Sequence, residues 1–264
     1  MTHHFFDRPV SEYMTREVEI ADADAPLEAL ARTLHDRGIS GLPVIESGKL
    51  IGVVTRTDLI QLGVLQTGRR WTSPTMALPH RRARDVMTHG AQVIAPSTPL
   101  RDAGRIMSER GLHRLFVVEG EQLVGVLSTA DLASAVRDAR IEAPLSAVMT
   151  SPILSIDVHA SLSAAVDLLA RVPVSGLIVT DDGLPVGLFT QLDALASRDL
   201  PRSTPLETTY DAAVICLPIE TKLHRAAAHA AQLDVRRVVV CQARDAVGVV
   251  SGLDFARVVS SDLT

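Results

Sequence analysis

Four segments of the chain carry the same polar residues at one spacing: a glycine, Ser or Thr three residues later, and Asp three residues after that. They are Gly52-Thr55-Asp58, Gly125-Ser128-Asp131, Gly187-Thr190-Asp193 and Gly248-Ser251-Asp254. At the start of a helix, Ser/Thr-x-x-Asp forms a capping box that satisfies free backbone N–H groups. The same carboxylate can instead accept hydrogen bonds from both hydroxyls of a ribose, while the helix N-terminus favours anionic groups nearby. The pattern by itself leaves both interpretations open.

A second recurring feature alternates between small and basic residues. It lies 13 and 14 residues after Leu27, Leu100, Leu162 and Leu223, and reads Ser40-Gly41, His113-Arg114, Ser175-Gly176 and Arg236-Arg237 in the four copies. A single basic pair on a strand is adequately explained as solvated surface. The recurrence in both even copies favours phosphate contacts, because Arg offers phosphate oxygens a forked set of donors.

These motifs belong to a fourfold internal repeat, since each glycine follows its leucine by 25 residues. In the first copy, Val18 and Ile20 predict a short strand, and Pro26 and Gly38 delimit a helix that begins at Leu27. Two apolar runs then predict a hairpin. Each unit is therefore strand, helix, strand, strand, helix, which makes the fold class α/β (α+β). A unit of about 50 residues cannot bury both faces of its sheet, so the units must pair.

The repeat spacing predicts two paired domains. The first spans residues 8–138, with repeats at about 10–60 and 83–136 and a linker at 61–82 outside the core. The second spans residues 144–262, with repeats at about 145–197 and 206–259. The linker region carries Arg69, Arg70, His80, Arg81, Arg82 and Arg84 around the single tryptophan, Trp71. This cluster is either a solvated loop or a segment that docks a partner or reaches a phosphate.

Composition narrows the class of protein. A net charge of −5 argues against a chain that coats nucleic acid or an acidic membrane, so small molecules or proteins are the expected partners. No apolar run reaches the roughly 20 residues that cross a bilayer, and the start resembles no signal sequence, which predicts a cytoplasmic location. Cys216 and Cys241 lie in apolar runs and predict packing roles. We expect no metal site and, lacking nucleophile elbow, phosphate loop or zinc motif, no enzymatic activity.

Taken together, the repeated residues resemble the cystathionine-β-synthase (CBS) domain family. Met-Thr precedes the first strand at Thr15, Thr88 and Thr150, whereas the fourth copy has Tyr210-Asp211. The resemblance implies pairs of domains about a pseudo-twofold axis, with adenosine-containing ligands bound in the cleft between partners. Four copies in one chain resemble the γ subunit of AMP-activated protein kinase, in which two pairs assemble into a disk.

The resemblance also assigns roles to residues. The ribose would be bound by Thr55, Asp58, Ser128, Asp131, Thr190, Asp193, Ser251 and Asp254, and the phosphates by His113, Arg114, Arg236 and Arg237. The base would lie beside Thr15, Ile20, Ser40, Gly41, Thr88, Val93, Thr150, Ser155, Ser175, Gly176 and Cys216. Asp211 departs from the pattern, because a carboxylate there repels phosphate; we expect it to weaken the site of the fourth copy.

The expected function is that of a stand-alone regulatory protein. It would bind AMP, ADP or ATP as a ligand, without a cofactor, and pass a conformational signal to a protein partner. A ligand-free interaction scaffold, or a sensor of S-adenosylmethionine or a dinucleotide, stays open. Both a monomeric disk and a homodimer are compatible with four copies in one chain.

Overall fold

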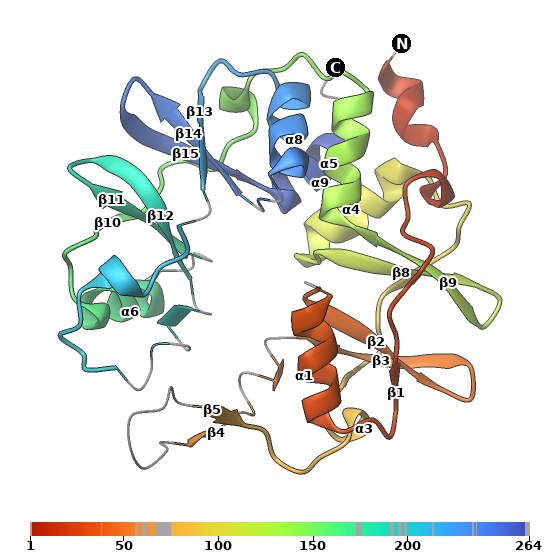
Figure 1. Ribbon diagram of the computed structural model, residues 1–264. Helices are drawn as coiled ribbons and strands as arrows, with labels where there is room; N and C mark the ends of the chain where they lie inside the picture. Colours follow the sequence, from red (N-terminus) through yellow and green to blue (C-terminus); the bar gives the residue numbers. More distant parts are fainter. Residues whose placement is uncertain are drawn as a thin grey trace. The chain divides into compact units, whose positions relative to one another are not determined.

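The computed structural model describes residues 2–261 except 38, 56–57, 60–61, 63, 67–74, 173–175, 191–192, 195–196, 198–199, 213, 234 and 236. Four small sheets of three or four strands repeat along the chain, and a helix follows the first strand of each in the sequence (Figure 1). The mixed α/β class predicted from the repeat is confirmed.

Every copy uses one order of elements. Copy one has β1 (Ala21–Asp22), α1 (Leu27–Asp36), β2 (Gly41–Glu46) and β3 (Lys49–Thr55). Copy two has β7 (Val93–Ile94), α4 (Leu100–Arg110), β8 (Arg114–Glu119), β9 (Gln122–Ser128) and α5 (Thr129–Asp138). Copy three has β10 (Ser155–Asp157), α6 (Leu162–Arg171), β11 (Gly176–Asp181) and β12 (Leu184–Thr190). Copy four has β13 (Ile215–Pro218), α8 (Leu223–Gln232), β14 (Arg237–Gln242), β15 (Asp245–Ser251) and α9 (Gly252–Ser260).

Short elements connect the copies. They are η1 (Thr2–Asp7), η2 (Val10–Glu12), β4 (Val64–Gln66), β5 (Thr75–Ala77), α3 (Ala83–Val86), β6 (Thr88–His89), η3 (Leu145–Ala147) and η4 (Leu206–Thr208). The closing helices expected after Asp58 and Asp193 lie largely outside the described residues.

Each sheet combines a parallel and an antiparallel pair. The first strand of a copy runs parallel to the second, as β10 does to β11 and β13 to β14, and the second and third strands form the predicted hairpin. The turn of the first hairpin places Ser47 at φ 50° and Gly48 at φ 80°. Two successive positive φ angles are typical of the type I′ turn, whose twist matches that of the strands.

The first strands begin later than predicted. In copy one, β1 starts at Ala21, whereas the alternation of Val18 and Ile20 predicted a strand there. A strand needs a hydrogen-bonded neighbour, and residues 16–20 connect a bridge at Thr15 to the beginning of the pairing with β2. The side-chain alternation was therefore a poor guide to where pairing starts.

The core is aliphatic, as composition predicted. In copy one, Leu27, Leu30 and Leu34 of α1 are at most 2% exposed and pack on Leu42 and Val44 of β2. Copy three repeats this arrangement with a cluster comprising Leu162, Ala165 and Leu169 of α6 and Leu177, Val179 and Phe189 of the sheet. The helix stripe predicted from the i, i+3, i+7 spacing is thus the buried face.

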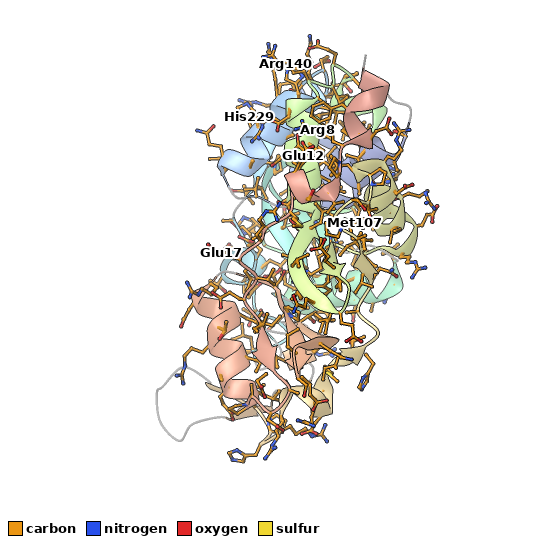
Figure 2. All side chains as sticks on the ribbon, turned by 90° about the vertical axis from the view of Figure 1, so that its right-hand side faces the viewer. Arg8, Glu12, Glu17, Met107, Arg140 and His229 are labelled. Atoms are coloured by element: carbon orange, nitrogen blue, oxygen red, sulfur yellow. The ribbon has the colours of Figure 1, made fainter. Side chains whose placement is uncertain are left out.

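The chain forms two compact units. One comprises Met1–Tyr13, Ser97–Arg114 and Ser128–Thr264, and the other comprises Met14–Pro96 and Leu115–Leu127. Within the first, α4 and α5 pack on α8 and α9. A β-carbon at Gly104 would lie 2.7 Å from the Ala256 carbonyl oxygen, and Met107 of α4 is fully buried (Figure 2). The predicted division at residues 138–144 stays a prediction.

The segment 61–82 differs from the expected linker. Its strands β4 and β5 pair antiparallel, and Leu62 and Leu78 pack against the core of copy one. Arg82 lies 2.6 Å from Asp24, and Arg84 also binds Asp24 at 2.8 Å, so ion pairs already engage these two arginines. Trp71, Arg69 and Arg70 lie outside the described residues.

Candidate functional site

The repeated motifs lie where the chain entering one copy crosses the last strand of its partner copy. Thr150 of copy three exchanges backbone hydrogen bonds of 2.9 and 3.1 Å with Val249 of copy four. Asp211 of copy four does the same with Leu188 of copy three, at 2.9 and 2.8 Å. Thr15 pairs with Val126, and Thr88 with Val53, in copies one and two. The bridges therefore join copy one to copy two, and copy three to copy four.

A second set of bridges lies just before the helices. Leu145 and Leu223 donate to the carbonyls of Thr221 and Ala143, both at 2.9 Å. Leu162 and Leu206 donate to the carbonyls of Thr204 and Ala160, at 2.8 and 3.1 Å. Copies three and four thus exchange equivalent contacts in both directions, which is the local two-fold relation that paired repeats predict.

We call each crossing a junction and name it by its aspartate. The Asp254 junction comprises residues 143–150, 221–223 and 248–254. The Asp193 junction comprises residues 160–162, 187–190, 193 and 204–211. The Asp58 junction comprises residues 25–27, 52–55, 58 and 81–88. Each of the three lies within one compact unit.

The crossing explains the invariant glycine of the four motifs. A β-carbon added at Gly52 would lie 2.6 Å from Met87 Sδ, and one at Gly125 would lie 2.6 Å from Met14 Sδ. Met149 covers Gly248 in the same way, and the Tyr210 ring covers Gly187. The methionine of each Met-Thr pair therefore packs on the glycine of the partner copy, and Tyr210 takes the place of methionine at Gly187.

The Ser/Thr and Asp of each motif form the predicted capping box. Oδ2 of Asp58 accepts hydrogen bonds from the Thr55 backbone N–H and hydroxyl, both at 2.7 Å. The corresponding distances are 2.6 and 2.7 Å at Ser128-Asp131, 2.8 and 2.6 Å at Thr190-Asp193, and 2.6 and 2.7 Å at Ser251-Asp254. The same oxygen, Oδ2, accepts these two hydrogen bonds in all four copies, so they do not involve Oδ1.

The four carboxylates differ in their surroundings. Asp254 is 2% exposed, and its Oδ1 accepts from Arg257 and, at 3.5 Å, from the Thr150 hydroxyl. Burial raises the pKa of Asp131 above its usual range, although hydrogen bonds from Ser128 act in the opposite direction. Arg257 is a functional candidate that the motif search missed. Its signal was an Asp-x-x-Arg spacing, which puts both side chains on one helix face.

The small and basic positions lie on the strand next to the capping residues. Gly41 is directly opposite Thr55, Gly176 opposite Thr190, and Arg237 opposite Ser251. Arg114 begins β8 beside β9, and the carbonyl of His113 accepts from the backbone N–H of Thr129 at 3.0 Å. Ser40 lies just before β2 and is half-buried. Ser175 and Arg236 lie outside the described residues.

Of the positions that the resemblance places beside a base, Gly41 is buried, whereas those on or just before the first strands are open to solvent. Ile20 is 54% exposed and Val93 is 45% exposed, although both are large apolar side chains. Ser155 and Cys216, at the same repeat position, are also exposed, as are Thr15, Thr88, Thr150 and Asp211. Ile20 and Val93 occupy the same repeat position in two copies. A bound aromatic ring would cover these exposed apolar side chains.

The structure also shows which copy Asp211 affects. Its backbone bridge is to Leu188, so it belongs to the Asp193 junction and not to the motif of its own copy. From the sequence, we expected Asp211, which stands where the other copies have Thr, to weaken the site of the fourth copy. Each junction in fact combines the first-strand residue of one copy with the carboxylate of the other.

The chain belongs to the CBS domain family. The family model for the CBS domain matches residues 10–64, 83–138 and 145–199, which are the first three copies. The fourth copy is identified by its structure, because it has the same strand and helix order and the same capping box.

Relatives and solved structures agree with this assignment. An uncharacterized 33.4 kDa protein of Thermofilum pendens is 28% identical over 202 residues, covering 71% of this chain and 63% of the relative. Uncharacterized protein MJ0188 of Methanocaldococcus jannaschii is 32% identical over 126 residues, covering 47% and 42%. The chain therefore spans less than two thirds of the length of these two relatives.

The full fold is similar to that of two solved structures. One is protein MJ1225 of Methanocaldococcus jannaschii, a candidate archaeal homologue of γ-AMPK. It has a TM-score of 0.73 and 13% identity, covering 95% of this chain and 99% of that one. The other is an uncharacterized conserved protein of Pyrococcus horikoshii, with a TM-score of 0.67, 18% identity and the same coverage. At these identities the similarity establishes the fold.

The described residues contain neither a membrane-spanning helix nor a cluster of metal ligands. No helix among them has the length and apolarity needed to cross a membrane. No group of three or more His, Cys, Asp or Glu side chains in the described ranges is arranged to hold a metal ion.

Proposed function

We propose that the protein is a regulatory CBS protein that binds an adenine nucleotide, AMP, ADP or ATP, at its junctions. The observation that carries the proposal is the Asp254 junction. There the Thr150 hydroxyl of copy three lies 3.5 Å from the Asp254 carboxylate of copy four, and Arg237 stands opposite Ser251. A hydroxyl, a carboxylate and a guanidinium from two copies are the groups that a ribose and a phosphate require.

The junctions also provide a route from binding to a signal. A nucleotide held by residues of two copies favours the relative arrangement of those copies that it binds best. A partner protein that prefers the same arrangement is then bound more tightly when the nucleotide is present. This role needs no catalytic group, and we assign none. The cytoplasmic location and the assembly, a monomeric disk or a homodimer, remain predictions.

Thermal unfolding with a panel of ligands tests the proposal. A nucleotide at 100 times its dissociation constant stabilises the folded state by about 2.7 kcal/mol, which raises the melting temperature by several degrees Celsius. The panel contains AMP, ADP and ATP, with adenosine, S-adenosylmethionine and NAD to separate the alternatives. Unchanged melting with every compound would rule out the nucleotide role.

Substitution of Arg237 by Ala locates the phosphate. We expect Arg237→Ala to weaken AMP binding and to leave adenosine binding unchanged, because only AMP carries a phosphate. Arg225→Ala is a matched control on α8 of the same copy, outside the three junctions. Equal loss of adenosine and AMP affinity in Arg237→Ala would place the arginine against the base or sugar.

A second function, a scaffold that binds no ligand, is favoured by one observation. All four carboxylates already cap helices, and Asp254 is also engaged by Arg257. If Asp131→Ala lowers the free energy of unfolding and no adenosine ligand binds the wild-type protein, capping is the role of these residues.

A further inference from the structure

The two cysteines of the chain, which the nucleotide proposal does not use as thiols, are neighbours on one face of one sheet. Cys216 on β13 is directly opposite Val239 on β14, and Cys241 follows Val239 by two residues. Side chains two residues apart on a strand point to the same face, so Cys216, Val239 and Cys241 share a face. Val239 and Cys241 pack with Ile178 and Leu188 of copy three, whereas Cys216 is exposed.

The other copies show that these two positions are matched to each other. Seven residues before and 18 residues after the helix-opening leucine, copy one has Ile20 and Ile45, and copy two has Val93 and Val118. Copy three has Ser155 and Thr180 in the same strand register. Both residues of the pair are therefore aliphatic in copies one and two, carry hydroxyls in copy three and carry thiols in copy four. In copy four the two side chains contact each other, because a hydrogen bond links the Cys216 and Cys241 thiols.

The two thiols also affect each other electrostatically. Burial raises the pKa of Cys241 to about 11, and the nearby Cys216 thiolate and Asp245 contribute. Burial raises the pKa of Cys216, while an interaction with the Cys241 thiol lowers it. Cys216 therefore loses its proton first, with Cys241 beside it as a donor. Arg237 lies on the same face of β14, two residues before Val239.

We propose that Cys216 and Cys241 form a two-thiolate site that captures one soft monovalent cation, such as Cu⁺. Soft thiolates select Cu⁺, and two sulfur ligands suffice for such an ion. Adjacent parallel strands lie about 4.8 Å apart and rise about 3.3 Å per residue, so Cα atoms offset by two residues are about 8 Å apart, which exceeds the roughly 4.4–6.8 Å of disulfides. An ion placed between the sulfurs spans that separation without movement of the strands. Binding converts two thiols and Cu⁺ into a bis-thiolate complex and releases two protons, with no change of oxidation state.

An anaerobic titration with Cu⁺ in competition with a chromophoric Cu⁺ chelator tests the site. We expect one equivalent per chain in the wild type, and its loss in Cys216→Ser and in Cys241→Ser. The double variant Cys216→Ser/Cys241→Thr, which recreates the hydroxyl pair of copy three, should also fail to bind and should keep the wild-type unfolding transition. Because two protons leave, the apparent affinity should rise about 100-fold per pH unit near neutrality.

Three results would overturn the proposal. The first is a single-cysteine variant that retains the wild-type affinity, which would mean that the thiols act separately. The second is an affinity that rises only tenfold per pH unit, since one proton per ion means one thiolate ligand. The third is loss of both free thiols to a disulfide in air, reversed by a reductant. Cys216 is also one of the residues predicted to lie beside the base, so the titration is done without nucleotide. It measures Cu⁺ bound per chain, whereas the nucleotide proposal is tested by thermal unfolding with ligands, so failure of one and failure of the other are separate results.

Discussion

The Asp254 and Asp193 junctions of copies three and four have the same backbone bridges and the same capping hydrogen bonds, but the side chains around them differ. At the Asp254 junction Met149 covers the glycine, Thr150 faces the carboxylate, and Lys222 pairs with Glu142. At the Asp193 junction Tyr210 covers the glycine, Asp211 replaces the threonine, and His159 pairs with Glu207. The comparison shows that the repeat conserves the crossing of two backbones and leaves the charge of each junction free to change.

The largest effect should come from the two capping aspartates. Asp254→Ala should lower the free energy of unfolding by about 3 kcal/mol, because Asp254 is buried and both its oxygens accept hydrogen bonds. Asp193→Ala should cost about 1 kcal/mol, the usual value of a helix cap. Urea unfolding of both variants measures the difference. Equal losses would show that Arg257 and Thr150 contribute nothing to the Asp254 junction.

The glycines should respond unequally to an added methyl group. Gly187→Ala should cost about 2 kcal/mol, because the new β-carbon meets the Tyr210 ring and lies 2.7 Å from the Asp211 carbonyl oxygen. Gly248→Ala should cost about 1 kcal/mol, since the nearest atoms belong to the flexible Met149 side chain, which can move. Unfolding midpoints at equal m-values test this order. A larger loss at Gly248 would contradict the proposed role of methionine as the adaptable cover.

Asp211 should set the ligand preference of the Asp193 junction. If nucleotides bind there, Asp211→Thr should raise the affinity for AMP up to about fivefold, because removing one exposed like charge contributes at most about 1 kcal/mol. Thr150→Asp is the reciprocal change and should weaken binding at the Asp254 junction. Calorimetric titration of AMP and adenosine separates the charge effect from a change of shape. Equal gains for both ligands would contradict a charge effect.

The smallest effect should be a pH dependence confined to one junction. The Glu207 carboxylate raises the pKa of His159 above its ordinary value of 6.5, chiefly through their hydrogen bond. A raised folded-state pKa stabilises the folded state fully below pH 6.5, and this stabilisation is lost as the pH rises through the raised value. The free energy of unfolding, measured against pH, should therefore fall in the wild type as the pH becomes alkaline. His159→Gln should not show this fall. Lys222→Gln, at the other junction, should leave that pH profile unchanged.

Much of the fold could be predicted from the sequence because the cues are local. The proline before Leu27 and the two apolar runs of the hairpin each act within a few residues, and the helix and the hairpin were found where predicted. The capping boxes were also predictable, since Ser128 and Asp131 are three residues apart on one turn. The start of β1 was not, because a strand begins where a distant partner becomes available.

The sequence by itself determined the number of copies, their order of elements, the capping carboxylates and the positions at which copies differ. Only the tertiary structure decided which residues meet: Met149 with Gly248, Thr150 with Asp254, Asp211 with the motif of copy three, and Cys216 with Cys241. For the first three pairs the physical reason is the crossing of chains between partner copies, and for the cysteines it is the pairing of two strands of one sheet. A repeat records each copy separately, whereas hydrogen bonds and packing at a junction join residues from two copies, such as Leu188 with Asp211 and Thr15 with Val126.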